Sequence, residues 1–150
     1  MHKAQIGTVS EATLRPQDLI QAFLWELDWL GEDISQWERE IPEDEDSEWW
    51  DTEEPNWILD ELFDALNEHA PELCYFGAHV GDWADFGFWP IDDIFDGEDI
   101  VARGPELPDK PTDEMQDTEN PDLFMTVSDH GNYELYSWNG TEWVSEWGIV

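Results

Sequence analysis

Apolar and polar positions along the chain first predict a helix that begins near Arg15 and ends at Gly31. Apolar residues recur through this stretch at the spacing of one helix face; they are Leu19, Ile20, Phe23, Leu24, Leu27 and Leu30. Pro16 suits the first helical turn, and Gly31 suits the stop. Residues 35–39 could add one more helical turn.

A second helix is predicted from about Asn56 to His69, with Asn56 as its N-cap and Pro71 after its end. Its buried side would contain Trp57 or Ile58, followed by Leu59, Leu62, Phe63 and Leu66. Three acids, Asp60, Asp64 and Glu68, follow one another at intervals of four residues on another side, roughly 6 Å of helical rise apart. Like charges at this spacing destabilise an isolated helix, so packing must hold this one.

Short apolar and aromatic runs predict the strands. Residues 5–9, 73–78 and 86–91 fit this pattern, and the turn residues 81–85 between the last two indicate a hairpin. The last thirty residues predict a three-strand meander over 123–127, 132–138 and 141–149. A two-residue Asn139-Gly140 turn would place Tyr136 opposite Trp143 and Leu135 opposite Val144.

Together these elements predict an α+β fold, with two main helices packed on an antiparallel sheet of four to six strands that ends in the meander. A chain of 150 residues suits a single domain over residues 1–150, with a sizeable core. Residues 92–121 are rich in Pro, Asp, Glu and Gly, and they are expected to form a mobile or functional loop.

Charge changes this picture, because the chain has 39 acidic residues against 5 Lys and Arg and a formal net charge of −34. Residues 40–102 contain 21 acids and no Lys or Arg. Few carboxylates can therefore pair within the chain, and the rest must face water, cations or a basic partner. Direct nucleic-acid binding is excluded, since phosphate contacts need basic side chains. An anionic membrane surface is disfavoured for the same reason.

The segment 41–57 combines this charge with aromatic residues. Eight carboxylates surround the Trp49-Trp50 pair, and Trp57 follows; the acids are Glu43, Asp44, Glu45, Asp46, Glu48, Asp51, Glu53 and Glu54. Disordered acidic tails lack aromatics, whereas this chain has 11 Trp, 7 Phe and 3 Tyr. The indoles are expected either to pin the acidic segment to the core or to anchor an interface from outside.

A rigid carboxylate array can imitate the dense negative charge of a nucleic-acid backbone. We therefore expect a non-enzymatic DNA mimic that occupies the basic nucleic-acid-binding groove of a host protein. The eight acids of the segment would form one contact surface, extended by Asp60, Asp64 and Glu68. A second acidic edge would contain Asp92, Asp93, Asp96, Glu98 and Asp99. A homodimer would double the length of this charge track.

Two other interpretations stay open. Scarce Lys and abundant acid also fit a salt-adapted accessory or structural protein without a nucleic-acid-site target, although salt adaptation does not require eleven Trp. Clustered carboxylates could also bind a divalent cation. The stretch 92–99 fails the EF-hand pattern, however, because with Gly97 in sixth place the third position is Ile94. No cofactor and no dedicated metal site are expected.

Catalytic arrangements are weaker. Cys74 with His79 or His69 could be written as a nucleophile and base, but its neighbours Leu73, Tyr75 and Phe76 predict a buried strand thiol. His79, Asp82 and Asp85 could form a small site, although a structural role for His79 is favoured. The single cysteine, together with the lack of a signal-like or membrane-length apolar run, indicates a cytoplasmic protein.

Two stretches, Tyr75–Trp89 and Ser128–Tyr136, resemble motifs of small, largely uncharacterised phage and plasmid proteins. They cover about a sixth of the chain and imply no activity. In size, charge and aromatic content, the chain also resembles phage-encoded DNA mimics: anti-restriction proteins, uracil-DNA glycosylase inhibitors and some anti-CRISPR proteins. Small accessory genes of mobile elements often counter host defences, so the two resemblances are consistent with each other. The second implies an inhibitor that acts in the host cytoplasm, with a defence nuclease complex as its expected target.

Overall fold

The computed structural model describes residues 2–91, 94 and 99–149. The chain, expected to form one domain, divides into two compact units, Met1–Trp89 and Pro90–Val150. Both units combine helix and strand, which confirms the α+β class. The strands expected in one sheet are distributed over a three-stranded and a four-stranded sheet.

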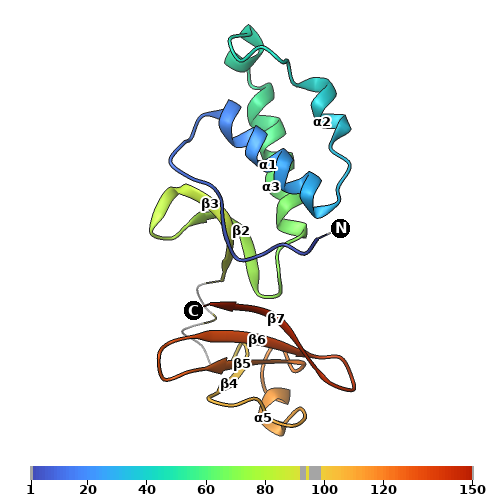
Figure 1. Cartoon of the computed structure of the whole chain (residues 1–150), viewed down its shortest axis with the longest axis vertical. Coiled ribbons are helices and arrows are strands. Elements are labelled where there is room, and N and C mark those ends of the chain that lie inside the picture. The colour runs from blue at the N-terminus through green and yellow to red at the C-terminus, as the bar shows by residue number, and fades with distance from the viewer. Residues whose placement is uncertain (1, 92–93, 95–98, 150) are drawn as a thin grey trace. The chain divides into compact units, whose positions relative to one another are not determined.

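The first unit packs helices against the small sheet (Figure 1). Its elements are β1 (Gly7–Ser10), α1 (Pro16–Leu30), α2 (Ser35–Glu40), the 3-10 helix η1 (Glu48–Asp51), α3 (Glu54–Glu68), β2 (Cys74–His79) and β3 (Asp82–Pro90). The strand order is β1-β3-β2, and β1 runs antiparallel to β3. The predicted turn over 81–85 is wrong: β3 already begins at Asp82, and the turn consists of Val80 and Gly81.

Helix α1 confirms the predicted boundaries and stripe. All six apolar residues of the predicted face are buried. Pro16 begins the helix, and Gly31 ends it in the left-handed conformation with φ of 98°. The Gly31 N–H donates to the carbonyls of Leu27 and Asp28. A residue with a Cβ would be strained at this φ, so glycine makes the sharp end possible.

Helix α3 begins two residues earlier than expected. Pro55 occupies the first turn and Glu53 the N-cap, so the assignment of Asn56 as N-cap is wrong. Pro55 fits there because the first helical N–H groups need no partner within the helix. Ile58 is buried and Trp57 is exposed, which decides between the two residues proposed for the inner face.

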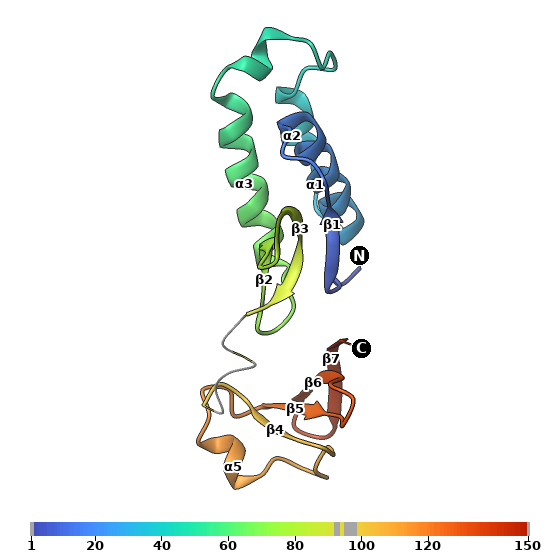
Figure 2. The same ribbon diagram turned by 90° about the vertical axis from the view of Figure 1, so that its left-hand side faces the viewer.

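Helices α1 and α3 lie side by side and run in the same direction (Figure 2). Two contacts mark their matching ends. Arg15, just before α1, pairs with Glu45, which precedes α3 in the chain. At the other end, the Glu32 carboxylate lies 2.8 Å from Nε2 of His69, just after α3. The return of the chain through α2 places the acidic segment where both helices begin.

A cluster of phenylalanines joins the helices to the sheet. Phe23 of α1 is fully buried, and its ring centroid lies 5.1 Å from Phe63 of α3, 5.2 Å from Phe76 of β2 and 5.9 Å from Phe86 of β3. These contacts are edge-to-face, the geometry that the aromatic quadrupole favours. This cluster gives the first unit its own core.

The second unit contains β4 (Ala102–Gly104), α5 (Asp113–Gln116), β5 (Leu123–Val127), β6 (Tyr133–Trp138) and β7 (Trp143–Ile149). Strands β5, β6 and β7 form the predicted antiparallel meander, whereas β4 pairs with β5 in parallel. The expected 92–121 loop therefore contains a strand and a short helix. Met115 of α5 packs with Ala102 and Phe124 in a buried cluster, which explains why this stretch folds.

The predicted register of the last hairpin is wrong. The structure pairs Tyr136 with Ser145 and Leu135 with Trp147. Oδ1 of Asn139 accepts the N–H groups of both Thr141 and Glu142, each at 2.9 Å, and this lengthens the loop to four residues. An irregularity between Leu135 and Tyr136 shifts the pairing again. Asn-Gly therefore indicated the hairpin correctly but not its length.

Gly87→Ala is expected to destabilise the first unit by about 1–3 kcal/mol, because the added Cβ would overlap the carbonyl oxygen of Gly7 across the β1–β3 pair. Gly81→Ala is the control, since its Cβ would meet only the exposed His79 ring. Urea unfolding should leave this control within about 0.5 kcal/mol of the parent. Equal stabilities for both variants would contradict the close approach at Gly87.

Candidate functional site

The acidic segment, defined here as residues 41–54, has an ordered backbone. The Ser47 hydroxyl accepts the N–H of Trp49 and caps η1, and the Thr52 hydroxyl donates to the Trp49 carbonyl at 2.6 Å. Oδ1 of Asp44 accepts the N–H of Asp46 at 2.9 Å. These local bonds replace helix or sheet pairing in a stretch that carries dense like charge.

The Trp49-Trp50 pair attaches this segment to the core. The two rings contact each other edge-to-face at 4.8 Å, and both pack against the buried cluster of the first unit. Nε1 of Trp50 also donates to the Asp44 carbonyl at 3.1 Å. Of the two roles considered for the indoles, Trp49 and Trp50 therefore have the first, attachment of the segment to the core.

Arg15 adds an electrostatic contact between the segment and α1. Its guanidinium lies 3.2 Å from Glu45 and 3.3 Å from Asp18, and the Gln17 amide donates to the Glu45 carbonyl at 3.4 Å. The charged groups are about half exposed, so each pair contributes at most about 1 kcal/mol. These exposed ion pairs therefore contribute little to holding the segment.

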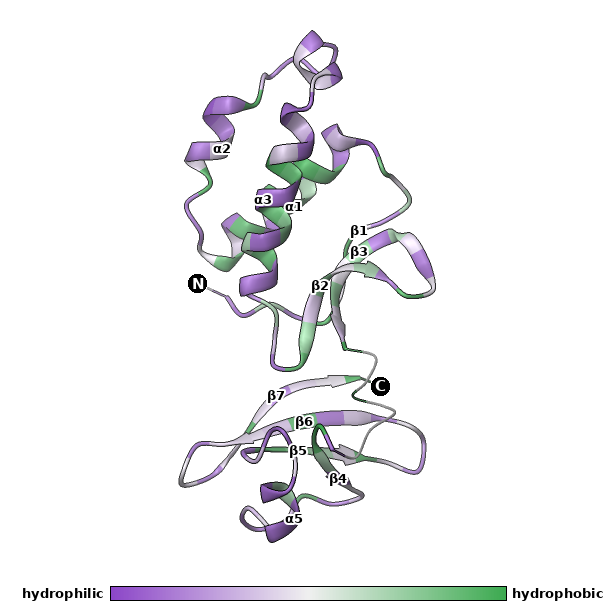
Figure 3. Ribbon diagram, turned by 180° about the vertical axis from the view of Figure 1, so that it is seen from behind, coloured by the Kyte–Doolittle hydropathy of each residue, from purple (hydrophilic) through white to green (hydrophobic). Residues whose placement is uncertain are grey.

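All eight acids of the segment are exposed. Within the described residues, Glu45 is the only one of the eight that pairs with a basic side chain. The segment thus presents its carboxylates outward while its indoles face the core. In Figure 3 hydrophilic colour covers most of the segment and of α2, whereas hydrophobic and hydrophilic colours alternate along α1 and α3.

Helix α3 continues from the segment and carries the predicted row of acids. Asp60, Asp64 and Glu68 are all exposed, as the helical spacing indicates. Glu61, next to this row, instead accepts a hydrogen bond from Nε1 of Trp37 at 2.9 Å and links α3 to α2. The eleven predicted acids of residues 43–68 therefore belong to one unit and to consecutive elements.

Of the predicted second acidic edge, the structure describes only Asp99. Asp99 belongs to the Pro90–Val150 unit, where its carbonyl accepts the N–H of Glu119 at 2.7 Å. Asp92, Asp93, Asp96 and Glu98 lie outside the described residues. The candidate site therefore rests on the acidic segment and the α3 row.

Among the residues that the structure describes, four indoles are exposed, and the sequence pattern indicated only one of them. Trp57, considered as an outward anchor, is 57% exposed at the start of α3. Trp25 and Trp29 of α1 and Trp83 of β3 are also exposed. Helical spacing could have indicated the α1 pair, because both lie off the apolar stripe and are four residues apart.

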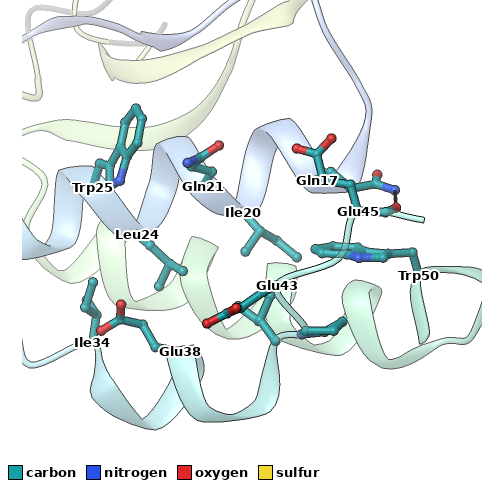
Figure 4. A pocket seen from close by; sticks show the side chains of 12 residues that line it. Gln17, Ile20, Gln21, Leu24, Trp25, Ile34, Glu38, Glu43, Glu45 and Trp50 are labelled. Carbon is teal, nitrogen blue, oxygen red and sulfur yellow. Dashed lines mark hydrogen bonds between the residues drawn. The ribbon is translucent and has the colours of Figure 1, made fainter. Parts of the chain in front are cut away.

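A groove of about 460 Å³ lies between α1, α2 and the acidic segment (Figure 4). Its apolar lining includes Ile20 and Leu24 of α1, Ile34 before α2, and Ile41 and Trp50 of the segment. Residues as far apart as Gln17 and Trp50 meet there, and no local motif indicated it in the sequence.

Residues considered for catalysis or metal binding have structural partners. Nδ1 of His79 accepts the Gly81 N–H, the Asp82 carboxylate accepts the Ala84 N–H, and the Asp85 carboxylate accepts the Thr8 hydroxyl. His69 contacts Glu32. Across residues 2–91, 94 and 99–149, no three His, Cys, Asp or Glu side chains lie close enough together to hold a metal ion.

The Cys74 thiol is poorly suited to nucleophilic chemistry. Burial, followed by the charge of Glu72, raises its pKa from 9.0 to about 12. The thiolate, which is the reactive form, is therefore scarce at neutral pH. The half-buried strand position agrees with the sequence expectation of a packed thiol.

The sequence matches no protein-family model, and the comparisons with curated proteins and with solved structures found no match either. In the part of the chain that the structure describes, no helix has the length and apolar character that crossing a membrane requires.

Trp50→Ala is expected to loosen the acidic segment, because it removes a ring packed on the core and the hydrogen bond to Asp44. Hydrogen exchange should accelerate at the amides of Trp49 and Thr52, and global stability should fall by about 1–3 kcal/mol. Trp57→Ala is the matched control, since that indole is exposed. Unchanged exchange in the Trp50 variant would show that other contacts hold the segment.

Cys74 is expected to react slowly with an aromatic disulfide reagent at pH 8 in the folded protein and rapidly after unfolding in urea. The unfolded thiol loses its proton near pH 9, whereas the folded one keeps it until about pH 12. The stability that this group contributes is therefore present below pH 9 and decreases as pH rises above it. Fast labelling of the native protein would contradict this environment.

Proposed function

We propose that this protein is a non-enzymatic inhibitor that imitates the nucleic-acid backbone and occupies a basic nucleic-acid-binding groove of a host protein. The observation that carries the proposal is the acidic segment. Its eight carboxylates are exposed on a backbone pinned by two indoles, so the charge has a defined geometry. A disordered acidic tail would lack that geometry.

The density of charge supports this proposal. Eight of the twelve residues from Glu43 to Glu54 are acidic, and α3 continues with Asp60, Asp64 and Glu68 at steps of about 6 Å. Duplex DNA carries one charge per about 1.7 Å of axis. A protein cleft that binds nucleic acid has Lys and Arg side chains spaced to pair with phosphates. The closely spaced carboxylates of the segment and of α3 could pair with the same side chains.

Pre-ordering of the carboxylates supports it further. Binding usually loses free energy through the ordering of side chains and loops. Here η1, the Ser47 cap and the Trp50 anchor already order the backbone that bears the charges. Most carboxylates of this surface have no basic partner within the described residues. Their negative electrostatic potential would therefore attract a basic protein over a distance and accelerate association.

Trp57 gives this surface an aromatic contact. It is exposed in the first turns of α3, three positions after Glu54, the last acid of the segment. Indoles are frequent among the residues that dominate interface energies, especially when charged groups surround them. Trp57 would therefore add apolar burial to an otherwise ionic interface.

The resemblances of the sequence supply the biological setting of the proposal. The resemblance of two stretches to motifs of phage and plasmid proteins, together with the overall resemblance to anti-restriction and anti-CRISPR mimics, favours a mobile-element product acting in the host cytoplasm. A defence nuclease complex is the target class whose basic groove such a product would occupy.

A salt-adapted accessory protein is the second candidate, and the spread of charge favours it. The Pro90–Val150 unit also exposes many acids, including Glu106, Asp109, Asp117 and Glu119. Such a protein should unfold as salt is removed and should not compete with DNA. A mimic should lose partner affinity steeply as salt rises.

Capture from host lysate at low salt, followed by elution with duplex DNA, tests the main proposal. The variant Asp46→Asn/Glu48→Gln/Asp51→Asn/Glu53→Gln removes four segment charges whose carboxylates make no hydrogen bond within the described residues. Affinity for the purified captured partner should fall at least about tenfold, with a shallower salt dependence, since each exposed pair contributes up to about 1 kcal/mol.

The control Glu106→Gln/Asp109→Asn/Asp117→Asn/Glu119→Gln removes the same charge from the Pro90–Val150 unit. It should retain most of the affinity, because the proposal assigns binding to the placement of the charges. Equal losses in both variants would indicate attraction by net charge alone. A captured partner that duplex DNA fails to displace would refute mimicry.

A further inference from the structure

The groove beside the acidic segment has an apolar floor and an edge whose charged residues are all acidic. Ile20 and Leu24 of α1 form the floor together with the Trp50 ring. Figure 4 shows the Ile20 and Leu24 side chains directed toward α2. An apolar depression of this volume is large enough to receive several side chains.

Charge on the edge of the groove is entirely negative. Glu38 of α2 and Glu43 of the segment line it across from α1, and Glu45 lies beside Gln17 of α1 (Figure 4). None of the residues that line the groove is Lys or Arg. Glu45 is paired with Arg15, while Glu38 and Glu43 are exposed and make no ion pair within the described residues. An apolar ligand that carried no positive charge would leave these carboxylates without compensation.

The geometry of the walls favours a helical ligand. One wall is α1 from Gln17 to Trp25, a length of about 12 Å or roughly two helical turns. Trp25 is 68% exposed and borders the groove on this side, directed away from Leu24 (Figure 4). A groove beside a helix is a common seat for the apolar face of another helix.

We propose that this groove binds a basic amphipathic helix of a partner protein. Two or three apolar side chains of that helix would lie on Ile20, Leu24 and Trp50. Its Lys or Arg side chains would pair with Glu38 and Glu43, and a cation on the opposite flank would lie over the exposed Trp25 ring. This inference rests on the groove alone and holds whether or not the acidic segment imitates nucleic acid.

Charge complementarity selects this occupant over others. Nucleic acid and anionic lipid would be repelled by Glu38, Glu43 and Glu45. A second copy of this chain would bring a net charge of −34 to an edge that is already negative. A partner helix with Lys and Arg beside its apolar face could pack that face on the apolar floor and pair its basic side chains with the carboxylates of the edge.

A pair of synthetic peptides tests the inference. The first is a peptide of about 18 residues with Leu at i, i+3, i+4 and i+7 and with Lys or Arg elsewhere, so that one face is apolar. The second has the same composition in an order that spreads Leu around the helix. The first should bind at least about tenfold more tightly at physiological salt, measured by calorimetry.

Two single variants locate the binding. Trp25→Ala should weaken binding of the amphipathic peptide several-fold, because this indole borders the groove. Trp57→Ala is the matched control, because Trp57 is similarly exposed but lies on α3 outside the groove. The indole N–H resonance of Trp25 should shift on titration, and that of Trp57 should not.

A double variant tests the edge. Glu38→Gln/Glu43→Gln should weaken peptide binding and its salt dependence, whereas Glu40→Gln/Glu53→Gln, with the same charge change outside the groove, should have little effect. Equal binding of both peptides, or equal losses in the Trp25 and Trp57 variants, would overturn the inference. Competition with duplex DNA is measured separately, so the groove and the mimicry can fail independently.

Discussion

The packing of α1 against α3 and the phenylalanine cluster is the interaction on which the first unit depends. Carboxylates that repel one another oppose compaction, and few bases are available to neutralise them. The six buried residues of α1 and the edge-to-face contacts of Phe23 supply an apolar attraction that salt does not screen. Acidic residues lie next to these buried residues in the chain. When the apolar side chains pack into the core, the acids are therefore held close together at the surface.

Helix α1 and the strand Leu123–Val127 could be predicted because their signals are local: an apolar period, a proline, a glycine or a short apolar run. The last hairpin could be predicted only in outline. Its register depends on how the Asn139 side chain bonds with Thr141 and Glu142, which residue type alone does not determine. The start of α3 was misplaced because Asn56 is a good cap, but Pro55 permits an earlier beginning.

Predictions about the site divide in the same way. Exposure of the acids followed from their chemistry. The conflict between charge and aromatic content indicated two roles for the indoles, and only the structure assigns attachment to the core to Trp49 and Trp50. The groove could not be predicted, since it depends on how α2 and the segment return beside α1. Trp25 was therefore not separated from the other aromatic residues of α1 on sequence alone. Its exposure and its position at the groove are visible only in the structure.

The shared direction of α1 and α3 has an electrostatic consequence for the acidic segment. Peptide dipoles add along each helix and leave a partial charge of roughly +0.5 at its N-terminus. Arg15–Glu45 marks the end where both N-termini lie, and Asp18 and Glu54 occupy the first turns there. The backbone itself therefore adds, close to the anionic segment, a positive potential to that of Arg15, the one basic side chain that pairs with the segment within the described residues.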